Sequence, residues 1–496
     1  MRTKGAALPS SPDSAARTFA HRNATTTGGR ASTHRARTPD PEPCSACSTT
    51  TGTSERPTST SRTSAEGSPT SSPSSPKSAS IRAVPSSSPS GKSGGRRLQN
   101  LPRRGVGAEA AVDFSYPPEA EAFRQELRTW LDANLDDASR AARLDEGDPG
   151  ERLEVLRRWN RTLADAGYAA VSWPSEYGGR DAGVMEQVVF SEEMHRAGAP
   201  GTVNPIGIAN IAPSIMSWGT QEQKSRFLQR MLRGDDIWCQ GFSEPGAGSD
   251  LASLRTRAVL DGDHYVVDGQ KVWNTFGDIA NYCELLVRTD PDAPKHRGIT
   301  CLLVDMKQPG ITVRPLVTIT GEKGFSELFF DSVRVPVESR LGPENEGWKV
   351  AMTTLNNERG GVASLHLQVR KKIRSLCEEA ASPELPGGPA TSDPRTRERL
   401  AQLYLEGETL KLLSDRAISA SVHGRAGPEG SLVKLVWSRV EQHVAELEGE
   451  LFGPEALLGA RGRRRLSARS MTIAGGTTQV NKNVVAQRVL GLPRNR

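Results

Sequence analysis

The spacing of apolar residues changes twice along this chain, and that change constrains the fold more than any other feature. Before residue 239 apolar residues recur at a period near 3.6, as at Phe123, Leu127 and Leu131, which is typical of amphipathic helices. From about residue 239 the period falls to two, which indicates strands, and after Gly347 the helical period returns. This order predicts an α+β, mostly α fold and excludes a parallel doubly wound sheet.

Three folded regions follow: an N-terminal helical domain at 113–238, an antiparallel β-barrel or sheet domain at 239–340, and a C-terminal helical domain at 345–496. Asp-Gly pairs at 261–262 and 268–269 predict tight turns, the second closing a hairpin of residues 265–273. Further short strands are predicted at 285–287, 299–304, 311–313 and 329–335. A Pro- and Gly-rich break at 382–394 is predicted to separate two long helical regions.

The first 108 residues differ in composition from the rest. They hold 22 Ser, 16 Lys and Arg and 5 Asp and Glu (net +11), whereas the other 388 residues hold 48 basic and 53 acidic groups (net −5). Runs such as SSPSSP at 71–76 lack the apolar side chains that offset chain entropy, so a disordered tail is predicted. Because the overall charge of +6 belongs to this tail, it gives no reason to expect nucleic-acid binding by the folded part.

Three interpretations of residues 1–108 remain open. A targeting peptide can be rich in Arg and Ser, but this stretch is long and has no evident amphipathic stripe. A regulatory or nucleic-acid-binding arm would fit the charge alone. The third and favoured interpretation is that the functional start lies downstream, near Val112, and that the tail is an upstream translation outside the native protein.

Several classes of site are not expected. There is no run of 18 apolar residues, so no membrane span is predicted. Cys44 and Cys47 form a lone C-x-x-C without the second pair that zinc needs, so no metal site is predicted. The other cysteines are expected to be buried small hydrophobes in a reducing, cytoplasmic compartment: Cys239, Cys283, Cys301 and Cys377. Neither a Rossmann nor a P-loop glycine pattern is present.

Two stretches near the start of the β-region could contact a ligand. Residues 242–250 (FSEPGAGSD) place two glycines and small hydroxyls in a turn whose N–H groups could cradle an anionic or heteroaromatic ligand, although a plain tight turn would read the same way. Residues 272–275 (VWNT) end a predicted strand. Taken alone, Trp273 is more readily interpreted as a core residue than as a stacking surface for a planar ring.

A carboxylate interrupts the apolar face of the first helix after the strands. Trp348, Ala351 and Leu355 form a stripe at i, i+3 and i+7, and Glu358 continues it at i+10. An unpaired carboxylate facing the interior or a cleft has a raised pKa, which suits a base that removes a weakly acidic proton. A buried ion pair or a frayed helix end is the structural alternative, although Arg359 cannot pair with Glu358 because adjacent helical side chains diverge.

Over residues 113–496 the chain resembles the acyl-CoA dehydrogenase family. The matching stretches are 219–224 (GTQEQK), 242–250, 265–275 (YVVDGQKVWNT), 329–336 (FFDSVRVP) and 472–479 (TIAGGTTQ). The resemblance implies the family's fold, with a C-terminal four-helix-bundle-like domain, and FAD between the β-domain and the C-terminal helices. It also implies an acyl-CoA substrate that loses its α-proton to a base and a β-hydride to flavin N5.

The resemblance further implies roles for individual residues. Flavin contacts are implied for Gln240, Phe242, Ser243, Ser249, Trp273, Asn274, Thr275, Thr477, Thr478 and Gln479. Substrate contacts are implied for Ser249, Asn356, Arg359 and Gly476. Most family members carry the base in Tyr-Glu-Gly-Thr near the C-terminus, where this chain has Gly475. Isovaleryl- and long-chain-type members place it before an Arg on the first long C-terminal helix, which matches Glu358 and makes it the predicted catalytic base.

Two further departures from the family pattern concern partners. The Arg-x-x-Phe-Gly stretch that reaches a neighbouring subunit's FAD is RKKI at 370–373, and the Gln-x-x-Gly-Gly-x-Gly stretch is ELFGPEA at 450–456. A homo- or hetero-tetramer is expected, with a related acyl-CoA dehydrogenase chain as partner, as in heteromeric members that degrade steroid side chains. Fatty acyl-CoA or steroid side-chain acyl-CoA would be the substrate and electron-transfer flavoprotein the acceptor. A non-catalytic structural subunit and, more remotely, a flavin oxidase are the alternatives.

The favoured interpretation of the tail predicts that it can be removed. A chain that begins at Val112 should fold and bind cofactor as well as the full chain, because none of the matching stretches lies in residues 1–108. Thermal unfolding and flavin absorbance of the two purified chains would check this. A loss of either property on truncation would give the tail a role in the working protein.

Overall fold

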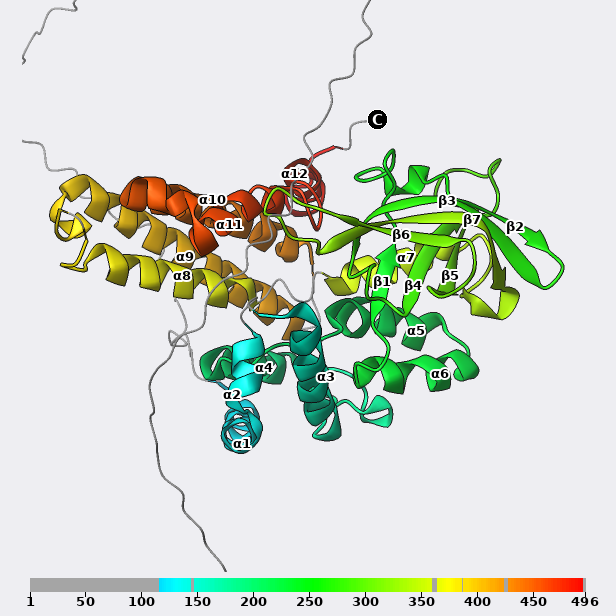
Figure 1. The fold of residues 1–496 in the computed structure, drawn as a ribbon, viewed down its shortest axis with the longest axis horizontal. Coiled ribbons are helices and arrows are strands. Elements are labelled where there is room, and N and C mark those ends of the chain that lie inside the picture. The colour runs from blue at the N-terminus through cyan, green and yellow to red at the C-terminus, as the bar shows by residue number, and fades with distance from the viewer. Residues whose placement is uncertain (1–115, 144–146, 359–363, 386, 423–426, 494–496) are drawn as a thin grey trace, which may run out of the picture. The chain divides into compact units, whose positions relative to one another are not determined.

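The computed structural model of the protein describes residues 116–143, 147–358, 364–385, 387–422 and 427–493, with the backbone alone at Glu358. All of them belong to one compact unit, Val106–Arg496. The predicted tail, Val112, Cys44, Cys47 and Arg359 lie outside the described residues. In the described chain, helices come first, a sheet follows and further helices end the chain (Figure 1).

The N-terminal helices are α1 (Pro118–Asn134), α2 (Asp137–Ala142), α3 (Pro149–Asp165), α4 (Val184–Ala197), α5 (Ala212–Trp218) and α6 (Gln221–Leu232). Several begin at residues that favour helix starts. Asp136 and Asp148 cap α2 and α3 by accepting backbone N–H groups, and Thr220 and Gln223 form a capping box on α6. The sequence therefore sets where these helices start.

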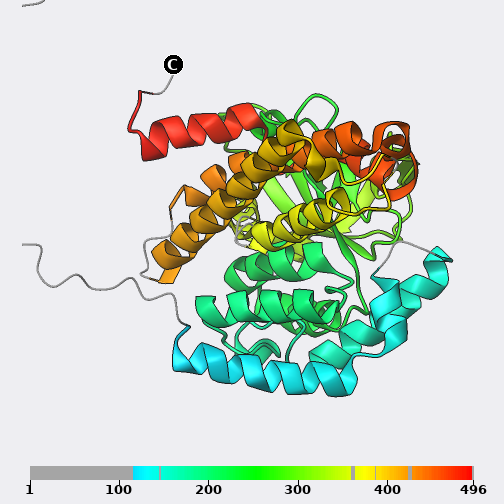
Figure 2. The same cartoon turned by 90° about the vertical axis from the view of Figure 1, so that its left-hand side faces the viewer.

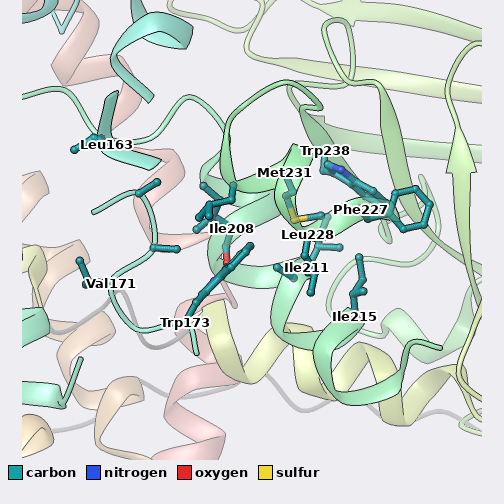
Figure 3. Close-up of a cluster of buried hydrophobic side chains, with 14 of the residues drawn as sticks. Leu163, Val171, Trp173, Ile208, Ile211, Ile215, Phe227, Leu228, Met231 and Trp238 are labelled. Atoms are coloured by element: carbon teal, nitrogen blue, oxygen red, sulfur yellow. The ribbon is translucent and has the colours of Figure 1, made fainter. Parts of the chain in front are cut away.

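Apolar faces of these helices meet in a core that extends into the sheet and the first C-terminal helix. Figure 3 shows part of it, including Trp173, Ile211, Ile215 and Phe227. The same buried cluster includes residues of the sheet and of helix α7 (Gly347–Glu358), namely Leu286, Cys301, Leu303, Val350 and Ala351. Burial of this continuous core holds α7 against both the sheet and the N-terminal helices.

The sheet strands are β1 (Trp238–Gly241), β2 (Arg257–Asp261), β3 (His264–Thr275), β4 (Tyr282–Arg288), β5 (Ile299–Asp305), β6 (Ile311–Leu316), β7 (Phe325–Pro336) and β8 (Arg340–Leu341). Their order is β6-β7-β3-β2-β4-β5-β8, and β1 also pairs with β4. The sheet is mixed, because β1 and β2 each run parallel to β4. The prediction of an antiparallel sheet is therefore wrong for these pairs: the β2–β3 hairpin lies between β1 and β4 in sequence, so β4 returns in the direction of β1.

The predicted hairpin turn at 268–269 is also wrong. Residues 264–275 form the single strand β3, and the turn lies earlier, at the other Asp-Gly pair, where Gly262 has a φ of +62°. Gly269 instead lies at a shift in register against β7. A Cβ at Gly269 would lie 2.7 Å from Thr256 Cα, so this glycine permits a close backbone approach rather than a turn.

The C-terminal helices after α7 are α8 (Leu365–Ala380), α9 (Pro394–Val422), α10 (Glu429–Phe452), α11 (Gly459–Ser467) and α12 (Thr478–Val484). The predicted break at 382–394 does separate two long helices, α8 and α9. Figure 2 shows α8, α9 and α10 side by side, and buried residues of all three, such as Ile373, Leu410 and Val440, form a separate core. The predicted fold class is confirmed. No helix in the described part of the chain is long and apolar enough to cross a membrane.

The two Asp-Gly glycines should differ in their tolerance of a methyl group. Gly269→Ala should lower the free energy of unfolding by about 3 kcal/mol, because the added Cβ meets the backbone of Thr256 at a strained φ of +152°. Gly262→Ala should cost only about 1 kcal/mol, since it adds left-handed strain without a contact. Urea unfolding of both variants measures this. Equal losses would contradict the close approach at Gly269.

Candidate active site

The turn after β1 is held in shape by its own backbone. Glu244 and Ala247 exchange N–H···O bonds of 3.0 Å, and Val272 N–H donates to Ser243 O at 2.9 Å, which ties the turn to β3. Phe242 is buried, whereas Ser249 at the far end of the turn is exposed. The start of the turn is therefore fixed by backbone hydrogen bonds, and Ser249 at its far end is exposed to solvent.

A buried ion pair anchors this turn to the sheet. Lys271 of β3 has no exposed surface, and its Nζ donates to Glu244 Oε1 at 2.8 Å and to Phe242 O at 3.1 Å. The Glu244 carboxylate also accepts the N–H groups of Arg255 and Thr256 at 2.7 and 2.8 Å. Burial alone would raise the pKa of Glu244, but Lys271 and Thr256 outweigh it and lower that pKa. Burial also lowers the pKa of Lys271, an effect that the charge of Glu244 opposes. The contact between Lys271 and Glu244 ties the turn to β3.

A groove of about 390 Å³ lies beside the turn. Its lining comes from the turn, from the segment before β2 and from the bulge in β3: Glu244, Pro245, Gly246, Ser253, Arg255, Thr256, Gly269 and Gln270. The glycine turn predicted as a ligand cradle therefore does border a concave surface.

Three buried polar atoms near the ends of β1, β3 and β7 have no hydrogen-bond partner among the described residues. They are Gln240 Nε2, Asn274 Oδ1 and Ser326 Oγ. Their residues adjoin, since Asn274 Nδ2 donates to Gln240 O and Asn274 pairs with Ser326 across β3 and β7. An unpaired buried polar atom costs about 1–3 kcal/mol, so both donors and acceptors here suit a ligand with its own polar edge.

Trp273 lies on the surface of the described chain rather than in the core. Its side chain is 59% exposed, its φ is +63°, and Phe325 meets it edge-on with ring centroids 5.9 Å apart. The interpretation of Trp273 as a core residue is wrong, because a register shift between Lys271 and Asn274 turns the indole outward. The exposed ring leaves a face free for stacking on a planar group.

Helix α7 carries the predicted base at its last residue, Glu358. The apolar stripe is confirmed, with Ala351 buried and Trp348 and Leu355 partly buried against the core. The side chain of Glu358 lies outside the described residues, and Asn356 is exposed.

The C-terminal candidates form a second group. Thr477 caps α12 by accepting Val480 N–H at 3.2 Å, Gln479 is exposed, and Gly476 has a φ of +90°. Helix α12 packs against α10. Among the described residues no hydrogen bond or ion pair joins 476–479 to the β-region. Among the described residues of this one chain, polar contacts therefore do not connect residues 476–479 with the turn at 242–250 or with Trp273.

Sequence reasoning missed one buried carboxyl, Glu284 of β4. It is fully buried and accepts the hydroxyl of Thr354 of α7 at 2.8 Å. Burial raises its pKa to about 8. An acid inside the apolar run CELLV at 283–287 is the sequence signal that could have revealed it. In the described residues no group of three or more His, Cys, Asp and Glu side chains could hold a metal ion.

The comparisons with known proteins agree with this architecture. Three family models match in order: the acyl-CoA dehydrogenase N-terminal domain at 117–235, the middle domain at 239–333 and the C-terminal domain at 345–490. Acyl-CoA dehydrogenase IpdE1 of Mycobacterium tuberculosis (strain ATCC 25618 / H37Rv) is 38% identical over 387 residues, which cover 76% of this chain and 98% of that protein. The chain belongs to the acyl-CoA dehydrogenase family, and its enzyme class is that of the acyl-CoA dehydrogenases, which are oxidoreductases.

Two solved structures are also similar. The ChsE4-ChsE5 complex from Mycobacterium tuberculosis has a chain with a TM-score of 0.66 and 34% identity, covering 77% of this chain and 100% of that one. The Tcur3481-Tcur3483 steroid ACAD has a chain with a TM-score of 0.65 and 30% identity, again over 77% of this chain and 100% of that one.

The buried ion pair should contribute far more than a surface pair on the same turn. Lys271→Met should lower the free energy of unfolding by about 3–5 kcal/mol, because it leaves the Glu244 carboxylate without its cation. Lys295→Met is the matched control: Lys295 binds Asp250 of the same turn at 2.8 Å in solvent, so its loss should change little. Urea unfolding compares them, and similar losses would show that Lys271 does not anchor the turn.

Proposed function

We propose that the protein binds FAD and removes hydrogen from the α- and β-carbons of an acyl-CoA thioester. The observation that carries this proposal is the group of unpaired polar atoms at Gln240, Asn274 and Ser326, next to the exposed ring of Trp273. Donors and acceptors beside a stacking surface fit the polar and planar parts of a flavin ring.

Residues of the β-region would hold the cofactor. Gln240 and Asn274 would bond the ring edge, Trp273 and Thr275 would line its face, and Phe242, Ser243 and Ser249 would contact it from the turn. When bound, FAD supplies the oxidant that accepts the hydride. Thr477, Thr478 and Gln479 would contact FAD from the C-terminal side.

Glu358 would act as the catalytic base. Its carboxylate takes the α-proton of the thioester, and the proton remains on a carboxylate oxygen. Ser249, Asn356, Arg359 and Gly476 would position the acyl-CoA. The first two are exposed, as a residue that meets an entering substrate must be.

The substrate class proposed is fatty acyl-CoA or steroid side-chain acyl-CoA. The similarity to a structure described as a steroid ACAD supports the second of these. Both substrates share the thioester and the saturated carbons that the chemistry needs. We propose electron-transfer flavoprotein as the acceptor of the electrons. The free buried thiols of Cys239, Cys283 and Cys301 support a reducing, cytoplasmic compartment.

A homo- or hetero-tetramer with a related chain is proposed, and two features support the related chain. The similar ChsE4-ChsE5 and Tcur3481-Tcur3483 structures each contain two named chains. Two basic residues at 370–373 are also bound within this chain, Arg370 to Glu408 and Lys372 to Glu441, at 2.8 and 2.7 Å. Because Arg370 is already paired with Glu408 of its own chain, it is a poor donor to the FAD of a neighbouring subunit. A second polypeptide would therefore complete the FAD site.

The same feature favours a second candidate function, a non-catalytic subunit that supports the active site of a partner. The presence of Glu358 favours the catalytic function. Flavin absorbance of the pure protein, with and without a co-expressed related chain, separates the two: a protein that binds flavin in neither preparation would be the structural subunit.

Replacement of the base should separate cofactor binding from chemistry. Glu358→Gln should retain FAD absorbance and lower the rate of acyl-CoA-dependent flavin bleaching by roughly 10²–10⁴-fold, because an amide cannot take the α-proton. Glu346→Gln is the control, since Glu346 near the start of α7 pairs with Lys349 at 2.7 Å and should be dispensable. Flavin bleaching of both variants is measured by anaerobic mixing with a panel of acyl-CoA thioesters that includes sterol derivatives. Unchanged bleaching by Glu358→Gln would place the base elsewhere.

A further inference from the structure

A polar cluster lies buried where α7 meets the sheet, within an otherwise apolar core. Glu284 of β4, Cys301 of β5, Thr354 of α7 and Ser214 of α5 each have no exposed surface. Helix α7 contacts both β5 and α5 (Figure 1). The cluster therefore joins four elements at the one place where the sheet, the N-terminal helices and α7 meet.

The polar groups of this cluster form one chain of hydrogen bonds. Thr354 Oγ1 lies 2.8 Å from Glu284 Oε1 and 2.7 Å from Ser214 Oγ. Either hydroxyl can donate in the bond between Thr354 and Ser214, because a neutral carboxyl at position 284 can itself donate to Thr354. Cys301 Sγ also donates to Glu284 Oε1, at 3.8 Å. Glu284 thus lies at one end of a buried chain of hydrogen bonds that runs from β4 through α7 to α5.

Burial favours the neutral form of Glu284 at pH 7. Burial raises its pKa from 4.5 to about 8, and the hydrogen bonds from Thr354 and Cys301 only partly oppose that shift. The residue that faces it from β1 is the uncharged Gln240, which pairs with Glu284 in register. Cys301 is the titratable neighbour from β5, and burial raises the pKa of that thiol as well. Oε2 has no partner among the described residues, whereas Oε1 lies within hydrogen-bond distance of Thr354, so Oε1 is the oxygen through which Glu284 holds α7.

The cluster acts on the last turn of α7. Thr354 and Glu358 are four residues apart, so they share one side of the helix. Apolar contacts of Val350 and Ala351 hold the middle of α7, and Trp218 Nε1 donates to Thr353 Oγ1 at 3.0 Å. Among the described residues, the bonds of Thr354 to Glu284 and to Ser214 are the buried polar attachments nearest to residue 358, and the bond to Glu284 is the one that ties α7 to the sheet.

We propose that Glu284 is a positioning residue, which holds Thr354 and thereby sets where the last turn of α7, with Glu358, lies relative to the sheet. This inference rests on the proposed role of Glu358 as the base. An apolar residue at position 284 could fill the same space but would remove the bond between Thr354 and the sheet, which leaves Ser214 and the Val350 carbonyl as the partners of Thr354. A Gln would keep an acceptor oxygen and stay neutral at every pH.

Substitutions at both ends of the bond test the proposal. Glu284→Leu and Thr354→Val should each lower the rate constant of flavin reduction about tenfold or more with little change in KM, since a small misplacement of a catalytic group is costly. The double variant should be no slower than Thr354→Val, because both single variants remove the Thr354–Glu284 bond and Thr354→Val also removes the bond to Ser214. Glu284→Gln should restore a rate near that of the parent.

The matched control perturbs the core elsewhere. Leu302→Ala alters the separate core of the β-region, which lacks α7, and should lower stability without changing the reduction rate. If Leu302→Ala and Glu284→Leu slow reduction equally, or if Glu284→Gln fails to restore the rate, Glu284 has only a structural role and the proposal is overturned.

A pH series gives a readout that is independent of catalysis. Because the folded protein holds the Glu284 proton more tightly than the unfolded chain does, stability should fall as pH rises from about 4.5 toward 8 and level off above it. In Glu284→Gln, the free energy of unfolding should lack this decrease with pH, because an amide does not titrate. An identical slope in both proteins would show that Glu284 is not the buried neutral acid the proposal needs.

The two proposals fail in different ways. If Glu358→Gln still bleaches the flavin, the proposed base is wrong, whatever Glu284 does. If Glu358→Gln is inactive while Glu284→Leu is folded and reduces flavin at the parental rate, only the positioning role is lost.

Discussion

The ion pair between Lys271 and Glu244 is the interaction on which the candidate site depends. Lys271 has no exposed surface, and Glu244 receives the ammonium group together with two backbone N–H groups. Separating the partners would leave a charge buried without compensation, which costs several kcal/mol. The turn after β1 is therefore tied to β3, the strand that carries Trp273 and Asn274.

A second constraint comes from α7, which is packed into the core shared by the sheet and the N-terminal helices. Parallel pairing of β1 with β4 places Gln240 beside Glu284. Strand β1, which carries the proposed flavin contact Gln240, therefore adjoins β4, whose Glu284 is hydrogen-bonded to Thr354 of α7. The cofactor side and the base side of the proposed site are thus connected through two neighbouring strands. A substitution in β1 or β4 would therefore affect both the proposed flavin contacts and the position of α7.

Local patterns predicted much of the fold but misjudged three features, one of which is the parallel pairing of β1 and β2 with β4. The order of helices and strands, the stripe on α7 and the break at 382–394 depend on periodicity and on Pro and Gly content, which are local. The hairpin at 268–269 and the core position of Trp273 were wrong, because Gly269 meets Thr256 and a bulge reorients Trp273. Those features depend on parts of the chain that are distant in sequence, which the local pattern does not contain.

The amino-acid order was enough to assign the family, the fold class and a candidate base at Glu358, since contiguous motifs and helical spacing carry that information. Tertiary structure alone showed that β1 is parallel to β4, that polar atoms of Gln240 and Asn274 lack partners among the described residues, and that Glu284 is a buried neutral acid. The reason is physical: the burial and hydrogen bonding of a side chain depend on residues far away in the chain, and only folding brings them together.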